Sequence, residues 1–170
     1  HFFNHIQDFF FNSFPDGNPP IFNSLKIGDG DSYNGSLDTK LSVNKSFSDL
    51  AYGFKFIKPS LEKVNLLGFL GGRRDHELFN LGEAHKLLLS DQINKKAKLI
   101  FDKSFICFPP GTHSVNLEGT FSLFALEKAS ITLTGQIKYP LPSLTEIGLL
   151  SSQCLSNISF GEFFIQSNKP

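Results

Sequence analysis

The stretch VNLLGFLGGRRDHELFNLGEAHKLLL, residues 64–89, joins an apolar run, a charged glycine turn and a helical pattern. The segment of residues 64–70 is short and apolar and is bounded by glycine, which is typical of a buried parallel strand. Residues 76–89 follow as a helix, and Asp75 can cap it. A strand, a glycine turn and a helix in this order predict an α/β sheet, whose ligands bind beyond the carboxyl ends of the strands.

Two helices are expected in this part of the chain. The helix over residues 76–89 is predicted to carry its apolar face on Leu78, Leu81 and Leu88. An earlier helix is predicted over residues 46–57, with either Ser46 or Ser48 as its N-cap. Its apolar face would be formed by Leu50, Phe54 and Ile57.

The pattern changes after about residue 92, where a polar linker leads into short strands. Residues 130–141 alternate strictly, and this predicts a half-buried antiparallel strand with Ile131, Leu133, Ile137 and Tyr139 on one face. Further strands are expected within residues 98–108, 119–126 and 157–167. We therefore predict two domains, a three-layer Rossmann-like α/β domain over residues 1–94 and an antiparallel β-sandwich over residues 95–170.

The overall composition excludes several classes of protein. The 170 residues carry a formal net charge of zero and are 40% hydrophobic, so a globular domain without a basic nucleic-acid footprint is expected. No apolar run is long enough to span a membrane. The two cysteines, Cys107 and Cys154, are too few for a disulfide scaffold and are expected to be buried. Because no signal peptide is recognisable either, we expect a cytoplasmic protein.

An acidic segment, Gly28-Asp29-Gly30-Asp31-Ser32, falls at one expected strand end. In extended backbone the side chains of Asp29 and Asp31 would point the same way. Two converging carboxylates need a cation between them, and a small number of hard oxygen ligands favours magnesium. An ordinary acidic turn explains the same residues equally well, because Gly, Asp and Ser are turn formers.

The second charged segment is Gly71-Gly72-Arg73-Arg74-Asp75-His76. Its glycines allow close approach of backbone to a ligand, and the planar fork of Arg73 suits phosphate. Asp75 can accept from a ligand hydroxyl as well as cap the helix, whereas His76 in a first helical turn is more often structural. Neither a Walker A segment nor a G-x-G-x-x-G segment is present, so a nucleotide would be bound by acids, a metal and arginine.

Ser156 and Asn157 stand just before the last expected strand. Serine and asparagine are common turn residues, which is the simpler interpretation. Their polar atoms could also bind a small heteroaromatic ligand, so this alternative stays open.

Taken in order, these segments resemble thiamine pyrophosphokinase. That family carries an acidic Gly-Asp-x-Asp-Ser segment, a Thr-Asp pair that opens a helix, Gly-Gly-Arg-x-Asp-His, a Gly-x-x-Tyr-x-Leu-like strand and a late Ser-Asn pair. The matching segments here are Gly28–Ser32, Ser48-Asp49, Gly71–His76, Gly135–Leu141 and Ser156-Asn157. The agreement runs from about residue 25 to the end of the chain, although Ser48 replaces the usual threonine.

The resemblance implies transfer of a pyrophosphoryl group from ATP to the hydroxyl of thiamine, with Mg²⁺, in a homodimer whose active sites form between subunits. It implies catalytic roles for Asp29, Asp31, Asp49, Arg73 and Asp75. The first three would bind the metal, ATP would contact Gly72, Arg73, Asp75 and His76, and thiamine would contact Ser156 and Asn157.

One departure from the family keeps other functions open. The family's first acidic motif, Asp-Gly-Gly, has only Asp16-Gly17-Asn18 as a counterpart here. The alternatives are transfer to another heteroaromatic alcohol such as a pterin, and a non-catalytic ligand-binding protein on the same scaffold.

Overall fold

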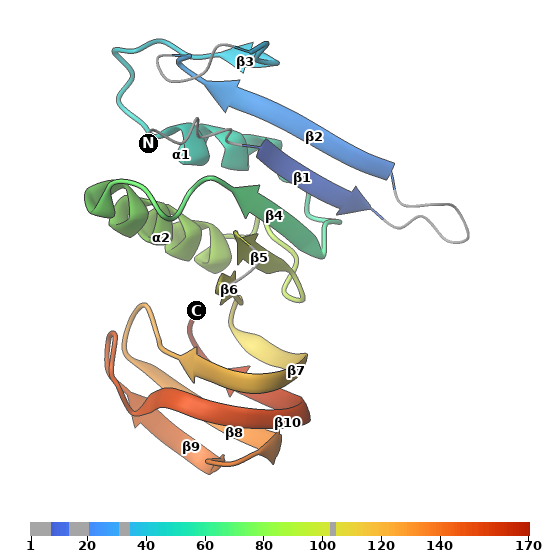
Figure 1. Ribbon diagram of the computed structural model, residues 1–170, viewed down its shortest axis with the longest axis vertical. Helices are drawn as coiled ribbons and strands as arrows, with labels where there is room; N and C mark the ends of the chain where they lie inside the picture. Colours follow the sequence, from blue (N-terminus) through green and yellow to red (C-terminus); the bar gives the residue numbers. More distant parts are fainter. Residues whose placement is uncertain (1–7, 14–20, 31–34, 103–104) are drawn as a thin grey trace. The chain divides into compact units, whose positions relative to one another are not determined.

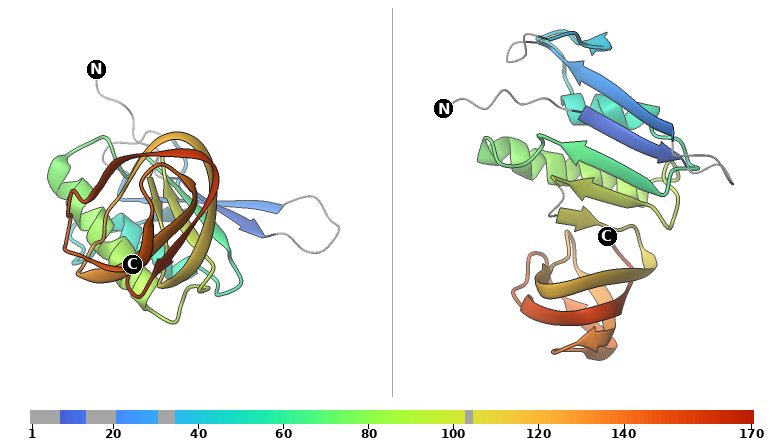
Figure 2. Two further views of the ribbon diagram at one scale, coloured as in Figure 1. Left: turned by 90° about the horizontal axis from the view of Figure 1, so that it is seen from below. Right: turned by 45° about the vertical axis from the view of Figure 1, so that its right-hand side comes forward.

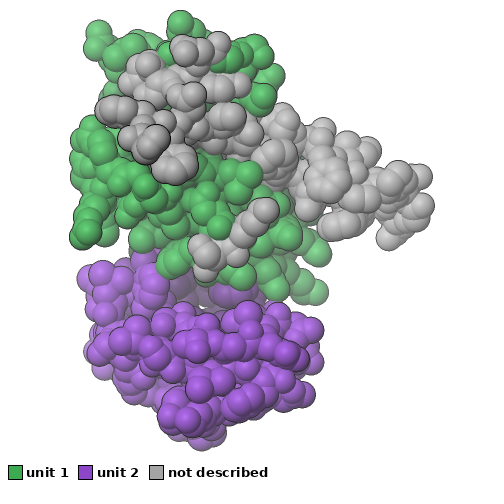
Figure 3. Space-filling model, viewed as in Figure 1, with its two compact units in different colours: residues 1–107 green, residues 108–170 purple. Residues whose placement is uncertain are grey.

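The computed structural model describes residues 8–13, 21–30, 35–102 and 105–170. The chain divides into two compact units, His1–Cys107 and Phe108–Pro170, which Figure 3 colours separately. The first unit contains both α-helices and a six-stranded sheet, and the second is built from strands alone. Among the described residues no helix is long and apolar enough to cross a membrane.

The sheet of the first unit is mixed and has the strand order β3-β2-β1-β4-β5-β6 (Figure 1). Its strands are β1 Asp8–Ser13, β2 Ile21–Gly28, β3 Thr39–Lys40, β4 Lys63–Leu67, β5 Lys98–Phe101 and β6 Phe105–Cys107. Strand β1 is antiparallel to both β2 and β4, and β4 is parallel to β5. Because β2, β4 and β5 therefore run in one direction, their carboxyl ends lie at the same edge of the sheet.

One face of this sheet forms the core of the unit. In β4, Val64 and Leu66 are buried while their neighbours are half-buried, and β5 repeats the pattern with Leu99 and Phe101. The buried residues of both helices join the same core. Within the described ranges this gives a two-layer unit, so the expected three layers are not found there. On the opposite face, the side chains of β4 and β5 are half-buried and partly polar, as at Asn65.

The two predicted helices are present, with one error in the buried face. Helix α1 spans Asp49–Gly53 and continues as a 3₁₀ turn, η1, over Phe54–Phe56. The three apolar residues expected on that segment are buried. Helix α2 spans Arg74–Leu89 and begins before Asp75, which is therefore not its cap. Of the predicted face, Leu88 is buried and Leu81 is half-buried, but Leu78 is 65% exposed. The other buried residues of α2 are Asn80, Ala84 and Leu87.

The boundary between the units lies later than the expected boundary at residues 94/95. The sequence pattern assigns the residues of β5 and β6 to the second domain, but β5 pairs with β4 and with β6 in the first sheet. Residues 91–97 are a turn between α2 and β5 rather than a linker between domains. The alternating pattern of a strand is the same whichever sheet it joins, so this error follows from local pattern alone.

The second unit is one curved antiparallel sheet with the order β7-β10-β8-β9 (Figure 2). Its strands are β7 Gly111–Leu123, β8 Ala129–Ile137, β9 Leu141–Ile147 and β10 Cys154–Ser167. Residues 108–170 thus form a single sheet, and a second layer that would make a sandwich is not among them. Ile131, Leu133 and Ile137 are buried as predicted, whereas Tyr139 lies beyond the end of β8 and is 56% exposed.

Candidate active site

The charged segments predicted from the sequence follow strands that end at one edge of the first sheet. Asp29 follows β2, the glycine turn at residues 68–73 follows β4, and Asp102 follows β5. The register places Lys26 and Leu67 opposite the same residue of β1. Leu67, the last residue of β4, is therefore level with a residue two positions before the end of β2, at a separation of two strand spacings, roughly 10 Å.

Three side chains form an ionic cluster at the end of β2. The ammonium group of Lys45 lies 3.1 Å from Asp29 Oδ2 and 3.0 Å from Asp49 Oδ1. The side chain of Lys45 is 11% exposed, and those of Asp29 and Asp49 are 19% exposed. Gly28 faces the carboxylate of Asp49, because a Cβ atom at position 28 would lie 3.8 Å from Asp49 Oδ2. This cluster brings together two of the three predicted metal-binding acids, and the third, Asp31, lies outside the described residues.

Local structure fixes Asp49 in this cluster. The N-cap of α1 is Ser48, whose hydroxyl accepts a hydrogen bond of 3.1 Å from the amide of Ala51. This confirms one of the two predicted caps and sets Asp49 as the first residue of the helix. Burial lowers the pKa of Lys45, but its hydrogen bonds and charge interactions with Asp49 and Asp29 outweigh this, so the pKa is raised.

The geometry of the cluster fits Mg²⁺ in part. Both carboxylates already converge on one cation, and the Lys45 ammonium acts as the stand-in ion. Two carboxylates suit Mg²⁺, which keeps several water or phosphate oxygens as its other ligands. Within the described ranges no group of three or more His, Cys, Asp or Glu side chains is arranged to hold a metal.

The turn after β4 is shaped by the side chains of Asp102, Asn80 and Glu77. Asp102 accepts hydrogen bonds from the amides of Gly68 at 2.8 Å and Leu70 at 3.0 Å. The buried Asn80 of α2 donates to the carbonyl of Phe69 at 2.8 Å.

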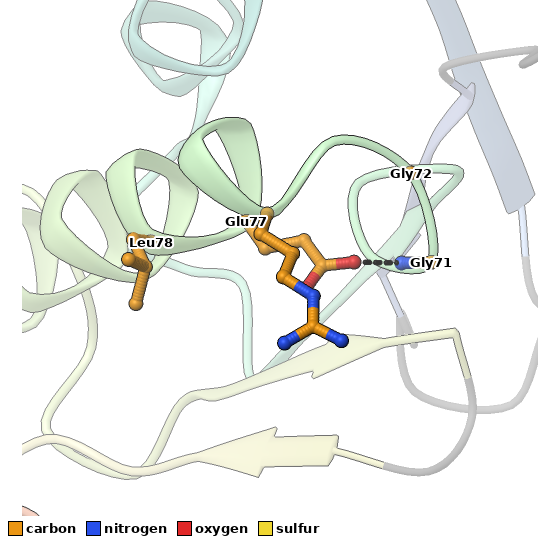
Figure 4. Close-up of a pocket in the computed structure, with 5 residues that line it drawn as sticks. Gly71, Gly72, Glu77 and Leu78 are labelled. Atoms are coloured by element: carbon orange, nitrogen blue, oxygen red, sulfur yellow. Dashed lines mark hydrogen bonds between the residues drawn. The ribbon is translucent and has the colours of Figure 1, made fainter.

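Glu77, also on α2, accepts from the amide of Gly71 at 2.7 Å (Figure 4). Gly71 has a φ of +89°, a conformation that glycine adopts without strain. The turn is therefore fixed by contacts to β5 and α2 before any ligand binds.

Arg73 and Asp75 form a second, exposed ion pair. Arg73 Nε lies 3.1 Å from Asp75 Oδ1, and a second guanidinium nitrogen contacts Oδ2. Arg73 is 71% exposed and Asp75 51% exposed, so both remain accessible. The hydrogen bond from Arg73 lowers the pKa of Asp75 to about 2, and the same contact raises the pKa of Arg73. Arg73 also occupies the N-cap position of α2, without a side-chain capping bond.

An open recess of about 480 Å³ lies beside this turn. Its lining residues are Gly71, Gly72, Arg74, Glu77 and Leu78, four of which are labelled in Figure 4. Arg74 thus lines the recess, whereas the Arg73 guanidinium is paired with Asp75. His76 is exposed on the first turn of α2.

The predicted thiamine-side residues lie in the second unit, on the bulge that begins β10. Asn157 is 2% exposed, and its side chain accepts from the amide of Tyr139 at 3.1 Å and donates to the carbonyl of Tyr139 at 2.8 Å. Ser156 is exposed, has a φ of +56°, and its backbone amide donates a hydrogen bond to the hydroxyl oxygen of Ser122. Asn157 therefore holds the turn after β8, and Ser156 is the more accessible of the two.

Sequence reasoning missed Lys45, Glu77, Asn80 and Asp102, which position the site from outside the recognised segments. Lys45 lies four residues before Asp49, which is the spacing of ion pairs in helices, but it precedes α1, so this spacing is only an indirect signal. Asp102 directly follows an apolar strand, which is also a recognisable signal. The predicted counterpart of the first acidic motif, Asp16-Gly17-Asn18, lies outside the described residues.

Comparisons with known proteins identify the fold. No protein-family model and no curated protein sequence matches the chain. The crystal structure of thiamine pyrophosphokinase from Bacillus subtilis is 22% identical, with a TM-score of 0.62, and the match covers 84% of this chain and 73% of that one.

Thiamin pyrophosphokinase from Geobacillus thermodenitrificans gives 22% identity, a TM-score of 0.58 and coverage of 84% and 72%. The crystal structure of a protein from Lactobacillus plantarum is 24% identical, with a TM-score of 0.56, and the match has the same coverage. The chain thus resembles thiamine pyrophosphokinases and has the fold of their crystal structures.

Proposed function

We propose that this protein transfers a pyrophosphoryl group from ATP to the hydroxyl of thiamine, giving thiamine diphosphate and AMP. One observation carries the proposal: Asp29 and Asp49 converge on a single cation at the sheet edge where the turn bearing Arg73 also lies. Structures of the same fold are thiamine pyrophosphokinases, which is what suggests this reaction for the site.

The phosphate side of the site would use charge and position. Asp29 and Asp49, with Asp31, would hold Mg²⁺, which neutralises charge on the reacting phosphates. Arg73 is exposed and can exchange its carboxylate partner for a phosphate oxygen at little cost, because both groups are solvated. Gly72, which lines the recess, gives the phosphates access to backbone, and His76 stands at the start of α2.

The proton of the attacking hydroxyl would be accepted by Asp49 or Asp75. A carboxylate with a pKa of about 2, as at Asp75, is a weak base at neutral pH. Its larger role would be to orient the hydroxyl, since positioning alone supplies much of the acceleration in such transfers. Asp49, which is paired with Lys45, would likewise act mainly by orienting the hydroxyl.

The proposal includes the acceptor side and the assembly. Ser156 and Asn157 would contact thiamine, in a β-sandwich domain completed within a cytoplasmic homodimer whose active sites form between subunits. The exposed hydroxyl of Ser156 is available for such a contact, whereas Asn157 would act mainly by holding the backbone of the turn.

The internal hydrogen bonds of Asn157 also leave room for a different acceptor molecule. Because most of the Asn157 amide is already used inside the protein, the acceptor site is less well defined than the phosphate site. Transfer to another heteroaromatic alcohol, such as a pterin, is therefore the alternative. The same assay distinguishes the two acceptors when each is offered separately.

The test is AMP release from ATP and Mg²⁺, with and without thiamine. We expect thiamine-dependent AMP from the wild-type protein and none above background from Asp29→Asn. Asp91→Asn, which changes an exposed acid after α2, is the matched control and should retain activity. If the wild-type protein releases no AMP with thiamine, the thiamine reaction is wrong; release with a pterin alone would establish the alternative.

A further inference from the structure

Lys45 occupies the position in which a metal ion bound by Asp29 and Asp49 would lie. Its ammonium nitrogen is within 3.1 Å of a carboxylate oxygen of each aspartate. The Lys45 side chain is only 11% exposed, so this contact is not a solvent-exposed surface ion pair. Two cations cannot share this position, because like charges at such short range repel strongly in a partly buried site.

The geometry also gives Lys45 a reason to remain there without a ligand. Two carboxylates at 19% exposure would repel each other if the ammonium group were removed. The lysine therefore keeps the end of β2 and the start of α1 in place. A divalent ion must displace it, and a ligand that brings its own negative charge offers the displaced ammonium a new partner.

We propose that Lys45 is a resident counter-cation that competes with divalent metal for the Asp29–Asp49 pair. It keeps free Mg²⁺ weakly bound, so that metal already carried on phosphate oxygens is preferred. In this role Lys45 is a positioning residue, because it acts through the two aspartates. The preference for phosphate-bound metal rests on the proposed function, whereas the competition with metal does not.

The experiment measures binding of Mg²⁺ alone by calorimetry, and of Mn²⁺ alone by electron paramagnetic resonance, to the full chain. Lys45→Met removes the charge and keeps the length of the side chain. We expect it to bind either metal about tenfold or more tightly than the wild type, since one opposing charge at contact distance is lost. Its Tm should fall without metal and rise when MgCl₂ is added.

Three further variants complete the design. Lys45→Arg keeps the charge and should bind metal as weakly as the wild type. Lys86→Met removes an exposed lysine that pairs with Glu83 on α2, and should leave metal binding unchanged. If Lys45→Met does not fold, Lys45→Gln makes the same comparison.

Equal metal affinity in the wild type and in the charge-removing Lys45 variants would overturn the proposal. The proposal would also be overturned if Lys86→Met gained as much metal affinity as Lys45→Met, because the effect would then come from the net charge of the protein. The measurement contains neither ATP nor thiamine. A chain that shows the competition but releases no AMP would therefore keep this inference and lose the proposed reaction.

Discussion

Helices α1 and α2 both begin beside a candidate active-site acid, but the two beginnings differ in burial and in capping. At α1, Ser48 caps the helix, and Asp49 is held against Lys45 with little exposure to water. At α2, Arg73 stands at the cap position without a capping bond and pairs with Asp75 in the open. The same combination of charges is thus fixed at one helix and exchangeable at the other.

The difference shows how burial decides what an ion pair does. A largely buried charge that loses its partner stays out of water unpaired, so each member of the Lys45 cluster depends on the others. A solvated charge that loses its partner is hydrated instead. The start of α1 is therefore a preformed part of the candidate site, whereas the exposed pair at the start of α2 is free to rearrange.

The largest effect should come from breaking the buried cluster. Asp49→Ala is expected to lower the free energy of unfolding by about 2–3 kcal/mol, below the full range for buried pairs because Asp29 still contacts Lys45 and the cluster is partly exposed. Urea unfolding followed by circular dichroism measures it. Asp75→Ala should shift the urea midpoint much less, because water screens the exposed pair; equal shifts in the two variants would remove the contrast.

A smaller effect is expected for the pairwise coupling. In a double-mutant cycle, Lys45→Met and Asp49→Ala should be non-additive by about 1–2 kcal/mol, since each removes the other's partner. The cycle of Arg73→Met and Asp75→Ala should show a clearly smaller non-additivity, because that pair is exposed to water. Coupling in the exposed pair as large as in the buried one would show that exposure does not control these interactions.

The cap of α1 should contribute less again. Ser48→Ala removes the hydroxyl that accepts from the Ala51 amide and should cost about 1 kcal/mol of unfolding free energy. Ser48→Asp restores an acceptor and should recover most of it. Ser46→Ala, at the exposed residue that the sequence offered as the other cap, is the control and should have no effect in the same urea titration.

The smallest effect concerns the pH dependence of the exposed pair. Carbon-detected NMR should place the pKa of Asp75 at about 2, and Arg73→Met should return it towards 3.8. Because the folded pKa is the lower one, the contribution of the pair to stability is present above pH 3.8 and is lost as pH falls towards 2. One molar NaCl should reduce the shift; a shift that is insensitive to salt would contradict a solvated pair.

Local pattern predicted the elements that carry these sites but not their long-range partners. The strand before Gly71, the helix after it and the Ser48 cap follow from hydrophobic spacing and capping chemistry, which act within a few residues. Lys45 contacts Asp29 from 16 residues away, and that contact depends on how β2 and α1 meet. The buried face of α2 is predicted only in part, because apolar residues occur around much of the helix and packing buries Leu88 but leaves Leu78 exposed.

The carboxylate of Asp102 has a consequence for sequence variation at this edge of the sheet. It accepts hydrogen bonds from two backbone amides of the turn after β4, and Asp102 itself has a φ of +46°. Asparagine and glycine tolerate that backbone conformation, but asparagine has one acceptor oxygen and glycine has none. In a saturation library selected for folded protein, position 102 should therefore retain aspartate far more strictly than the exposed charges around it.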